Sequence, residues 1–211
     1  NRVKSDSKNP SENHILNFNN SILFNERMKN MNFYNKVSSL NSIYDYKFEH
    51  NNSLNSQKNS NTLIFSSDIN LNNYNSLKPR FKIIHYQELD RSEGIINEDS
   101  DSISFNYNNQ YSDNRLFGND LLDNSSRVVY GLENYNKFYG QDFNFKVNQS
   151  YDFKKNSNFS NKINQNSNFS DYALEMSTTN NYIDFRIDIR VDENSFSKKE
   201  MNYGFSIDRS V

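Results

Sequence analysis

The charged residues between positions 184 and 190 form the densest group of side chains in this sequence that could do chemistry. Asp184 and Asp188 alternate with Arg186 and Arg190, so all four share one face of an extended strand. Carboxylate and guanidinium groups arranged in this way could bind a polar ligand or form a catalytic surface. Opposite charges that neutralise one another on a water-exposed sheet face explain the same pattern, and we favour that simpler interpretation.

Residues that could ligate a metal ion are scattered along the chain. His14, His50 and His85 lie far apart in the sequence, and there is no cysteine. The acidic run from Asn97 to Asp101 could hold calcium, but it lacks the central glycine and final glutamate of an EF-hand loop. A solvated turn is the simpler interpretation of that run, and we assign no metal ligand.

Catalytic signatures are equally sparse. The sequence contains no glycine-rich phosphate loop, no G-x-S-x-G elbow and no H-E-x-x-H zinc motif. We therefore expect the chain not to be an enzyme, and we assign it no catalytic or cofactor-binding residue. Residues that bind a ligand remain unassigned, and a net charge of -2 gives no reason to expect nucleic-acid binding.

The strand that carries the charged residues is polarised from end to end. Between Ile183 and Val191 every second residue is aliphatic or aromatic, and the residues between them are charged. Nine extended residues span roughly 30 Å, which a tilt of about 40° reduces to about 23 Å of height. This height is close to the apolar band of an outer-membrane β-barrel, about 25 Å. A half-buried strand of a soluble antiparallel sheet also alternates in this way.

The composition is compatible with a barrel whose strands face lipid on one side and water on the other. The chain has 211 residues, of which 34% are hydrophobic and 15% aromatic, and about a fifth are asparagine. Disordered chains are poor in Phe and Tyr, so we expect a folded protein. No segment approaches the ~20 apolar residues of a transmembrane helix. The first ten residues have no signal-peptide pattern. The chain lacks an initiator Met, so we expect it to be a fragment or a processed piece.

The second half of the chain is predicted to be a run of antiparallel hairpins. Alternating segments lie at residues 127–138, 143–153, 172–176, 183–192 and 201–207, with Gln149 as the one polar residue on an apolar face. The connections between these segments are short, long, short and moderate in turn. Outer-membrane barrels have short periplasmic turns and longer extracellular loops, so this rhythm favours a barrel.

The first half is patterned less clearly. Strands are indicated at residues 44–48, at 63–71 with a break near 66–68, at 81–85, and at Ile103, Phe105 and Tyr107. The stretch from Glu88 to Asp101 is then long where a short turn is due. We expect one barrel domain over residues 1–211, with weak strands in 1–79 and a clear hairpin succession in 80–211.

Aromatic residues at strand ends could form the interfacial girdles of a membrane barrel. The candidates are Tyr135, Phe138, Tyr139, Tyr151, Phe153 and Tyr182.

Several motifs occur in an order that points to a known family. Residues 96–100 (Ile-Asn-Glu-Asp-Ser) lead to residues 112–120 (Ser-Asp-Asn-Arg-Leu-Phe-Gly-Asn-Asp), 126–132 (Ser-Arg-Val-Val-Tyr-Gly-Leu) and 149–151 (Gln-Ser-Tyr). This succession resembles the C-terminal barrel of the LptD family, the lipopolysaccharide-assembly outer-membrane proteins also called organic solvent tolerance proteins. The resemblance covers about residues 80–208. Asn148 stands where the family often has glycine, and the loop at 117–120 is modified.

The resemblance implies an antiparallel transmembrane β-barrel in the cell outer membrane. About ten strands are readable, which would form an interior arc of a larger barrel. By resemblance the protein inserts lipopolysaccharide at the cell surface without catalysis. The implied partners are lipopolysaccharide, an LptE-like lipoprotein in the barrel lumen and a periplasmic LptA-like bridge.

Two other classes of protein remain open at this point. Another large outer-membrane barrel, such as a TonB-dependent receptor or a porin, would show similar strands. A soluble β-protein that recognises glycans would also alternate, but it would not need detergent to stay in solution.

Overall fold

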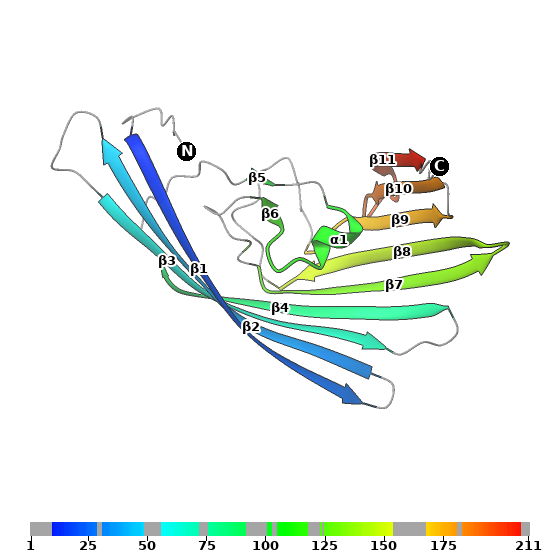
Figure 1. Cartoon of the computed structure of the whole chain (residues 1–211), viewed down its shortest axis with the longest axis horizontal. Coiled ribbons are helices and arrows are strands. Elements are labelled where there is room, and N and C mark those ends of the chain that lie inside the picture. Colours follow the sequence, from blue (N-terminus) through cyan, green and yellow to red (C-terminus); the bar gives the residue numbers. More distant parts are fainter. Residues whose placement is uncertain are drawn as a thin grey trace.

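The main feature of the computed structural model is one antiparallel sheet of nine strands (Figure 1). The structure describes residues 10–28, 31–48, 56–71, 76–91, 101–102, 105–117, 123, 125–153, 168–180 and 183–207. The order of the nine strands across the sheet is the same as their order along the chain. The strands are β1 (Pro10–Met28), β2 (Met31–Phe48), β3 (Ser56–Leu71), β4 (Leu77–Arg91), β7 (Arg127–Phe138), β8 (Gln141–Asp152), β9 (Tyr172–Thr179), β10 (Ile183–Val191) and β11 (Lys198–Ile207).

Two short strands and one helical turn stand apart from this sheet. β5 (Asp101–Ser102) pairs with β6 (Leu116–Phe117), and α1 (Tyr107–Gln110) lies between them in the chain. The predicted all-β antiparallel fold is confirmed. β1 and β11 lie at opposite edges of the sheet and are not paired with each other, so the chain forms an open arc. Among the described residues, no helix is long and apolar enough to cross a membrane.

The strand register separates the side chains into an apolar face and a polar face. One row of the apolar face crosses five strands, β7 to β11, without a break: Leu132, Val147, Leu174, Ile189 and Met201. The adjacent row on the other face is Glu133, Lys146, Glu175, Asp188 and Asn202. The alternation predicted from the sequence is therefore kept in register from strand to strand.

The apolar face is exposed although it carries large hydrophobic side chains. Phe81, Phe145 and Phe185 are 36–40% exposed, and Tyr203 is 78% exposed. In water such a contiguous apolar surface would drive association. Gln149, the polar exception on this face, is buried and accepts a 2.5 Å hydrogen bond from the Tyr130 hydroxyl.

The strand predicted at Ile103, Phe105 and Tyr107 is wrong. Ile103 lies outside the described residues, Phe105 is not in a strand, and Tyr107 begins α1. The Asn106 side chain accepts hydrogen bonds from the backbone N–H groups of Asn108 and Asn109, which caps this helical turn. Tyr107 and Tyr111 are four positions apart, which places both rings on one side of the helical turn. The alternation of Ile103, Phe105 and Tyr107 is too short to indicate a strand.

Without a strand at residues 103–107, short and long connections alternate along the whole sheet. β4 pairs directly with β7, so the whole of 92–126 is one long connection. Residues 29–30, 72–76, 139–140 and 180–182 form the short connections at one end of the sheet. The connections 49–55, 92–126, 153–171 and 192–197 are at the other end, as expected for a barrel with short turns on one side.

The first three strands are longer than the sequence indicated. β1, β2 and β3 have 19, 18 and 16 residues, against 8–12 in β7 to β11. The predicted break near residues 66–68 is wrong, because β3 keeps its register with β2 through Ser66, Ser67 and Asp68. These strands therefore extend well past the row in which β7 begins, at the end of the sheet where the long connections lie (Figure 1).

Candidate functional site

The described part of the long connection between β4 and β7 lies against the sheet (Figure 1), where it contacts side chains of the polar face. We call residues 92–126 the insert; its described part is 101–102, 105–117, 123 and 125–126. The Asn148 amide donates a 2.7 Å hydrogen bond to the Tyr107 carbonyl, and the Gln110 amide reaches the Ser170 hydroxyl and the Asp171 carbonyl, both at 3.2 Å. α1 is thus fixed to β8 and to the start of β9.

Two tyrosines of the insert pack among charged side chains of the sheet. The Tyr107 hydroxyl donates a 2.5 Å hydrogen bond to Glu133, and the Tyr111 ring lies 4.0 Å from the guanidinium carbon of Arg80. Both rings are buried and lie 5.4 Å apart, centroid to centroid. Burial raises the pKa of both hydroxyls well above the ordinary value. These tyrosines are therefore neutral hydrogen-bonding groups.

Gly131 makes the close approach of the insert possible. A Cβ atom at this position would lie 2.6 Å from the Val147 carbonyl oxygen and closer still to the Tyr111 hydroxyl oxygen. A side chain there cannot coexist with Tyr111 in its present position. Glycine in the Tyr-Gly-Leu motif is therefore required by packing between the insert and β7.

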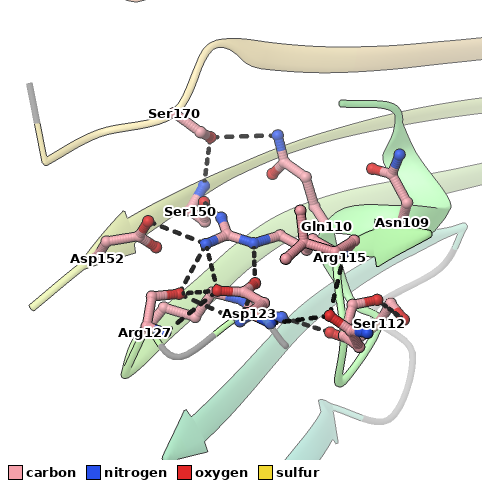
Figure 2. A network of polar contacts seen from close by, with 12 residues as sticks. Asn109, Gln110, Ser112, Arg115, Asp123, Arg127, Ser150, Asp152 and Ser170 are labelled. Atoms are coloured by element: carbon pink, nitrogen blue, oxygen red, sulfur yellow. Dashed lines mark hydrogen bonds and ion pairs between the residues drawn. The ribbon is translucent and has the colours of Figure 1, made fainter. Parts of the chain in front are cut away.

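The root of the insert is held by a buried cluster of four ionised groups (Figure 2). Arg115 donates to Asp123 at 2.5 Å and to Asp152 at 3.0 Å, and Arg127 donates to Asp123 at 2.7 Å. The exposed fraction of each side chain is at most 1%. Two cations and two anions balance, so the cluster is neutral as a whole.

Hydrogen bonds from neighbouring groups add to this buried cluster, although Arg127 Nε and Asp152 Oδ1 are buried without a hydrogen-bond partner among the described residues. The Ser125 hydroxyl donates a 2.6 Å hydrogen bond to Asp123, and Arg127 donates a 2.5 Å hydrogen bond to the Ser112 carbonyl. Burial alone would raise the pKa of Asp123, but Arg127 and Arg115 outweigh it and lower the pKa to about 2. Burial alone would lower the pKa of Arg115, but Asp123 and Asp152 raise it. The ion pair between Arg115 and Asp123 therefore persists at neutral pH.

A second ionic contact ties the insert to the first half of the sheet. The two oxygens of the Asp113 carboxylate accept from Lys36 of β2 at 2.9 Å and from Lys82 of β4 at 2.8 Å. We call these three residues the clasp. Burial would raise the pKa of Asp113, but the ammonium groups of Lys82 and Lys36 lower it. The insert therefore spans the polar face from β2 to β9.

Comparison with known proteins identifies the family to which this architecture belongs. A family model described as LptD, LPS transport system D, matches residues 9–210. The chain belongs to the LptD family. None of the curated proteins compared with it matches the chain.

Membership of the LptD family assigns the two faces of the sheet. The chain is part of an outer-membrane β-barrel of lipopolysaccharide transport, so the apolar face meets lipid and the polar face lines the lumen. The expectations of an outer-membrane location and a role in lipopolysaccharide assembly are confirmed. Nothing in the comparisons favours a nutrient receptor, a porin or a soluble glycan-binding protein.

Three of the motifs that carried the LptD resemblance converge in space, while residues 96–100 lie outside the described residues. Arg115 comes from the Asn-Arg-Leu-Phe segment, Arg127 and Gly131 from the Arg-Val-Val-Tyr-Gly-Leu segment, and Ser150 from Gln-Ser-Tyr. The Arg115 guanidinium lies 3.3 Å from the Ser150 hydroxyl. These motifs are therefore the parts of the barrel that bind the insert to the wall.

Three of the four charged residues of β10 take part in ion pairs, as the simpler interpretation predicts, while Asp184 is exposed and accepts a 3.4 Å hydrogen bond from the Ser206 hydroxyl. Arg186 pairs with Asp188 and Glu175, both at 2.9 Å. Arg190 lies 3.6 Å from Asp171 and 3.4 Å from Glu200. They belong to the lumen face.

The remaining residues considered from the sequence do not gather into a site. His85 lies on the apolar face beside the Ser126 hydroxyl at 2.8 Å, while the side chain of His14 and the whole of His50 lie outside the described residues. Of the acidic run 97–101, only Asp101 is described. Asp171, Asp192 and Glu193 form an acidic group whose centre holds the Lys199 ammonium, 2.7 Å from both aspartates.

The aromatic residues at strand ends divide between the two faces. On the apolar side, Tyr151 contacts Phe153 and Phe169 at 5.5 and 4.8 Å between ring centroids, at the end with the long connections. Tyr139, 97% exposed, lies in the short turn at the other end. Tyr135 is on the polar face, where its hydroxyl donates to Glu133, so its placement in a lipid-facing girdle is wrong. The side chains of Phe138 and Tyr182 lie outside the described residues.

Sequence reasoning missed the buried cluster and the clasp. In the sequence, Arg115 and Arg127 stand out only as members of the motifs shared with the LptD family. No local pattern marks the other residues of the two contacts, which are Asp123, Asp152, Lys36 and Lys82. One feature does indicate the buried cluster: Arg127 begins β7 and Asp152 ends β8, and the two residues are register partners at the end of the sheet with the long connections.

Proposed function

We propose that this chain is a wall of the lipopolysaccharide translocon in which the insert narrows the lumen near its extracellular end. The observation that supports this is the attachment of the insert to the polar face at the end of the sheet with the long connections. Long connections of such barrels are extracellular. A connection folded inward reduces the open cross-section at the cell surface while leaving the apolar face to lipid.

We propose that the role of this wall is mechanical and electrostatic, without catalysis. Many charged groups of the described lumen face are joined in ion pairs such as Lys146–Glu175 and Arg80–Asp68. Such pairs make a hydrated surface over which a charged glycolipid headgroup can move. The energy for transport would come from elsewhere in the pathway.

Removal of the insert tests this proposal. In the full-length protein, residues 105–117 are replaced by a short Gly-Ser linker, and a deletion of similar length in the β8–β9 connection is the control. Folding of each barrel is checked by its heat-modifiable electrophoretic mobility. We expect only the insert deletion to admit large antibiotics such as vancomycin. Unchanged permeability in a folded barrel would contradict the lumen-narrowing role.

An LptE-like lipoprotein in the lumen is the partner that we propose for the polar face of β9 to β11. An LptA-like bridge would dock on a periplasmic domain of the family rather than on this wall. A photocrosslinking residue at Asn202, on the polar face, should capture the lipoprotein, whereas the same residue at Tyr203 should not. Capture from both positions or from Tyr203 alone would refute this arrangement.

A further inference from the structure

The clasp differs from the buried cluster in its access to solvent. Lys36 is 38% exposed and Asp113 is 19% exposed, whereas the side chains of Arg115, Asp123 and Arg127 have no exposed surface. An ion in the lumen can therefore reach the clasp but not the buried cluster. Both contacts hold the insert, but only the ion pairs of the clasp can be replaced by an ion from the lumen.

The charges of the clasp do not balance. Lys36 and Lys82 bring two positive charges to a single carboxylate, that of Asp113. The nearby Arg80 is already paired with Asp68 at 2.6 Å and Glu133 at 3.7 Å. A phosphate monoester, which carries about -1.5 to -2 charges at pH 7 and three acceptor oxygens, would neutralise the two lysines more completely than one carboxylate does.

The backbone around Asp113 is held independently of its side chain. Arg127 donates to the Ser112 carbonyl at 2.5 Å and to the Asp113 carbonyl at 3.3 Å. Lys82 also donates to the Tyr111 carbonyl at 2.7 Å. The Asp113 carboxylate can therefore rotate away from the two ammonium groups while the root of the insert stays in place.

From these observations we propose that Lys36 and Lys82 form a binding site for a phosphate group on the sugar headgroup of the transported glycolipid. Asp113 occupies this site when no substrate is present and is displaced by the phosphate. This inference rests on the function in lipopolysaccharide transport. It places one anion-exchange step at the lumen wall between β2 and β4, next to the insert.

The test measures binding of rough lipopolysaccharide to the full-length protein in detergent, by microscale thermophoresis. Asp113→Asn removes the competing charge, so we expect affinity to rise about tenfold. Adding Lys36→Gln and Lys82→Gln to that variant should abolish the gain. Chemically dephosphorylated lipopolysaccharide should bind wild type and Asp113→Asn equally. Asp188→Asn, a carboxylate change on the same lumen face, is the matched control and should leave affinity unchanged.

Each outcome separates the clasp from the wider function. If wild type does not bind lipopolysaccharide at all, the transport role of this wall fails and the clasp fails with it. If wild type binds but Asp113→Asn gives no gain, only the clasp is refuted. A gain that persists with dephosphorylated lipid, or without the two lysines, also overturns it. Folding of every variant is checked by heat-modifiable mobility, and Asp113→Asn retains a side chain that can hydrogen-bond.

Discussion

At the scale of single residues, the positions that matter most in this wall are those where the insert meets the sheet. One of them is Gly131, where a side chain would clash with Tyr111. The others are charged groups that are stable in the interior only when they form ion pairs. Losing one member therefore costs more than the contact itself, because its partners remain buried and unpaired.

Replacing Gly131 with valine should separate the insert from β7. The new side chain would occupy the position of the Tyr111 hydroxyl, and overpacking of this kind costs about 1–3 kcal/mol. We expect faster proteolysis within residues 105–117 of the folded full-length protein. Gly204→Val is the control, since a Cβ at Gly204 meets no atom within 4 Å. Equal proteolysis rates in the two variants would argue against the packing role of Gly131.

Replacing Arg127 with methionine should destabilise the barrel by about 3–5 kcal/mol, because Asp123 loses a buried cation. The free energy of unfolding in urea, measured in detergent, tests this. Lys137→Met removes an exposed pair, Lys137 and Asp142, 3.8 Å apart. That change should cost at most about 1 kcal/mol. If both variants lost the same stability, the cluster would not anchor the insert.

Acid should weaken the attachment of the insert within a defined window. The folded-state pKa of Asp123 is about 2, below the unfolded value of about 3.9. The stabilisation is therefore complete above about pH 4 and declines as the pH falls toward 2. We expect wild type to lose about 2 kcal/mol of unfolding free energy across that range. Asp123→Asn, which has no carboxylate to protonate, should lack this component.

At the scale of the strand, the value of each residue depends on the face to which it belongs. Ile187 and Asp188 are neighbours in β10, yet Ile187 pairs with Tyr203 on the apolar face and Asp188 with Asn202 on the polar face. A shift of one residue in register would exchange the two environments for the whole strand.

Ile187→Arg should impair membrane assembly, costing about 2–4 kcal/mol near the bilayer midplane. Asp188→Asn should be nearly silent, because Arg186 keeps its pair with Glu175. The amount of heat-modifiable protein recovered from the outer membrane measures both. Equal tolerance of the two substitutions would contradict the assignment of faces.

The strands from Arg127 onward could be predicted because alternation is a local property of the chain. Alternation also misled the prediction at Phe105 and Tyr107, where two aromatic residues two apart suggested a strand although Asn106 caps a helical turn. The ion pair between Arg115 and Asp152 joins residues 37 positions apart. No local pattern encodes such a contact, since it depends on the return of the insert across β7 and β8.

At the scale of the whole molecule, the sheet has two unpaired edges, β1 and β11. Each edge presents backbone N–H and C=O groups that only further strands can satisfy in lipid. Residues 1–211 expressed alone should therefore aggregate or stay unfolded in plain buffer. Circular dichroism during heating checks this; a cooperative melt of soluble monomer would contradict it.

The reach of the insert across the sheet has a mechanical consequence. Its side chains and backbone are bonded to Lys36 on β2, Lys82 on β4, Arg127 on β7, Asp152 on β8 and Ser170 beside β9. It therefore acts as a cross-brace that resists sliding of one strand past the next. Separating two neighbouring strands between β2 and β9 would break these contacts as well as the backbone hydrogen bonds of the sheet, so we expect this arc to move as one rigid unit.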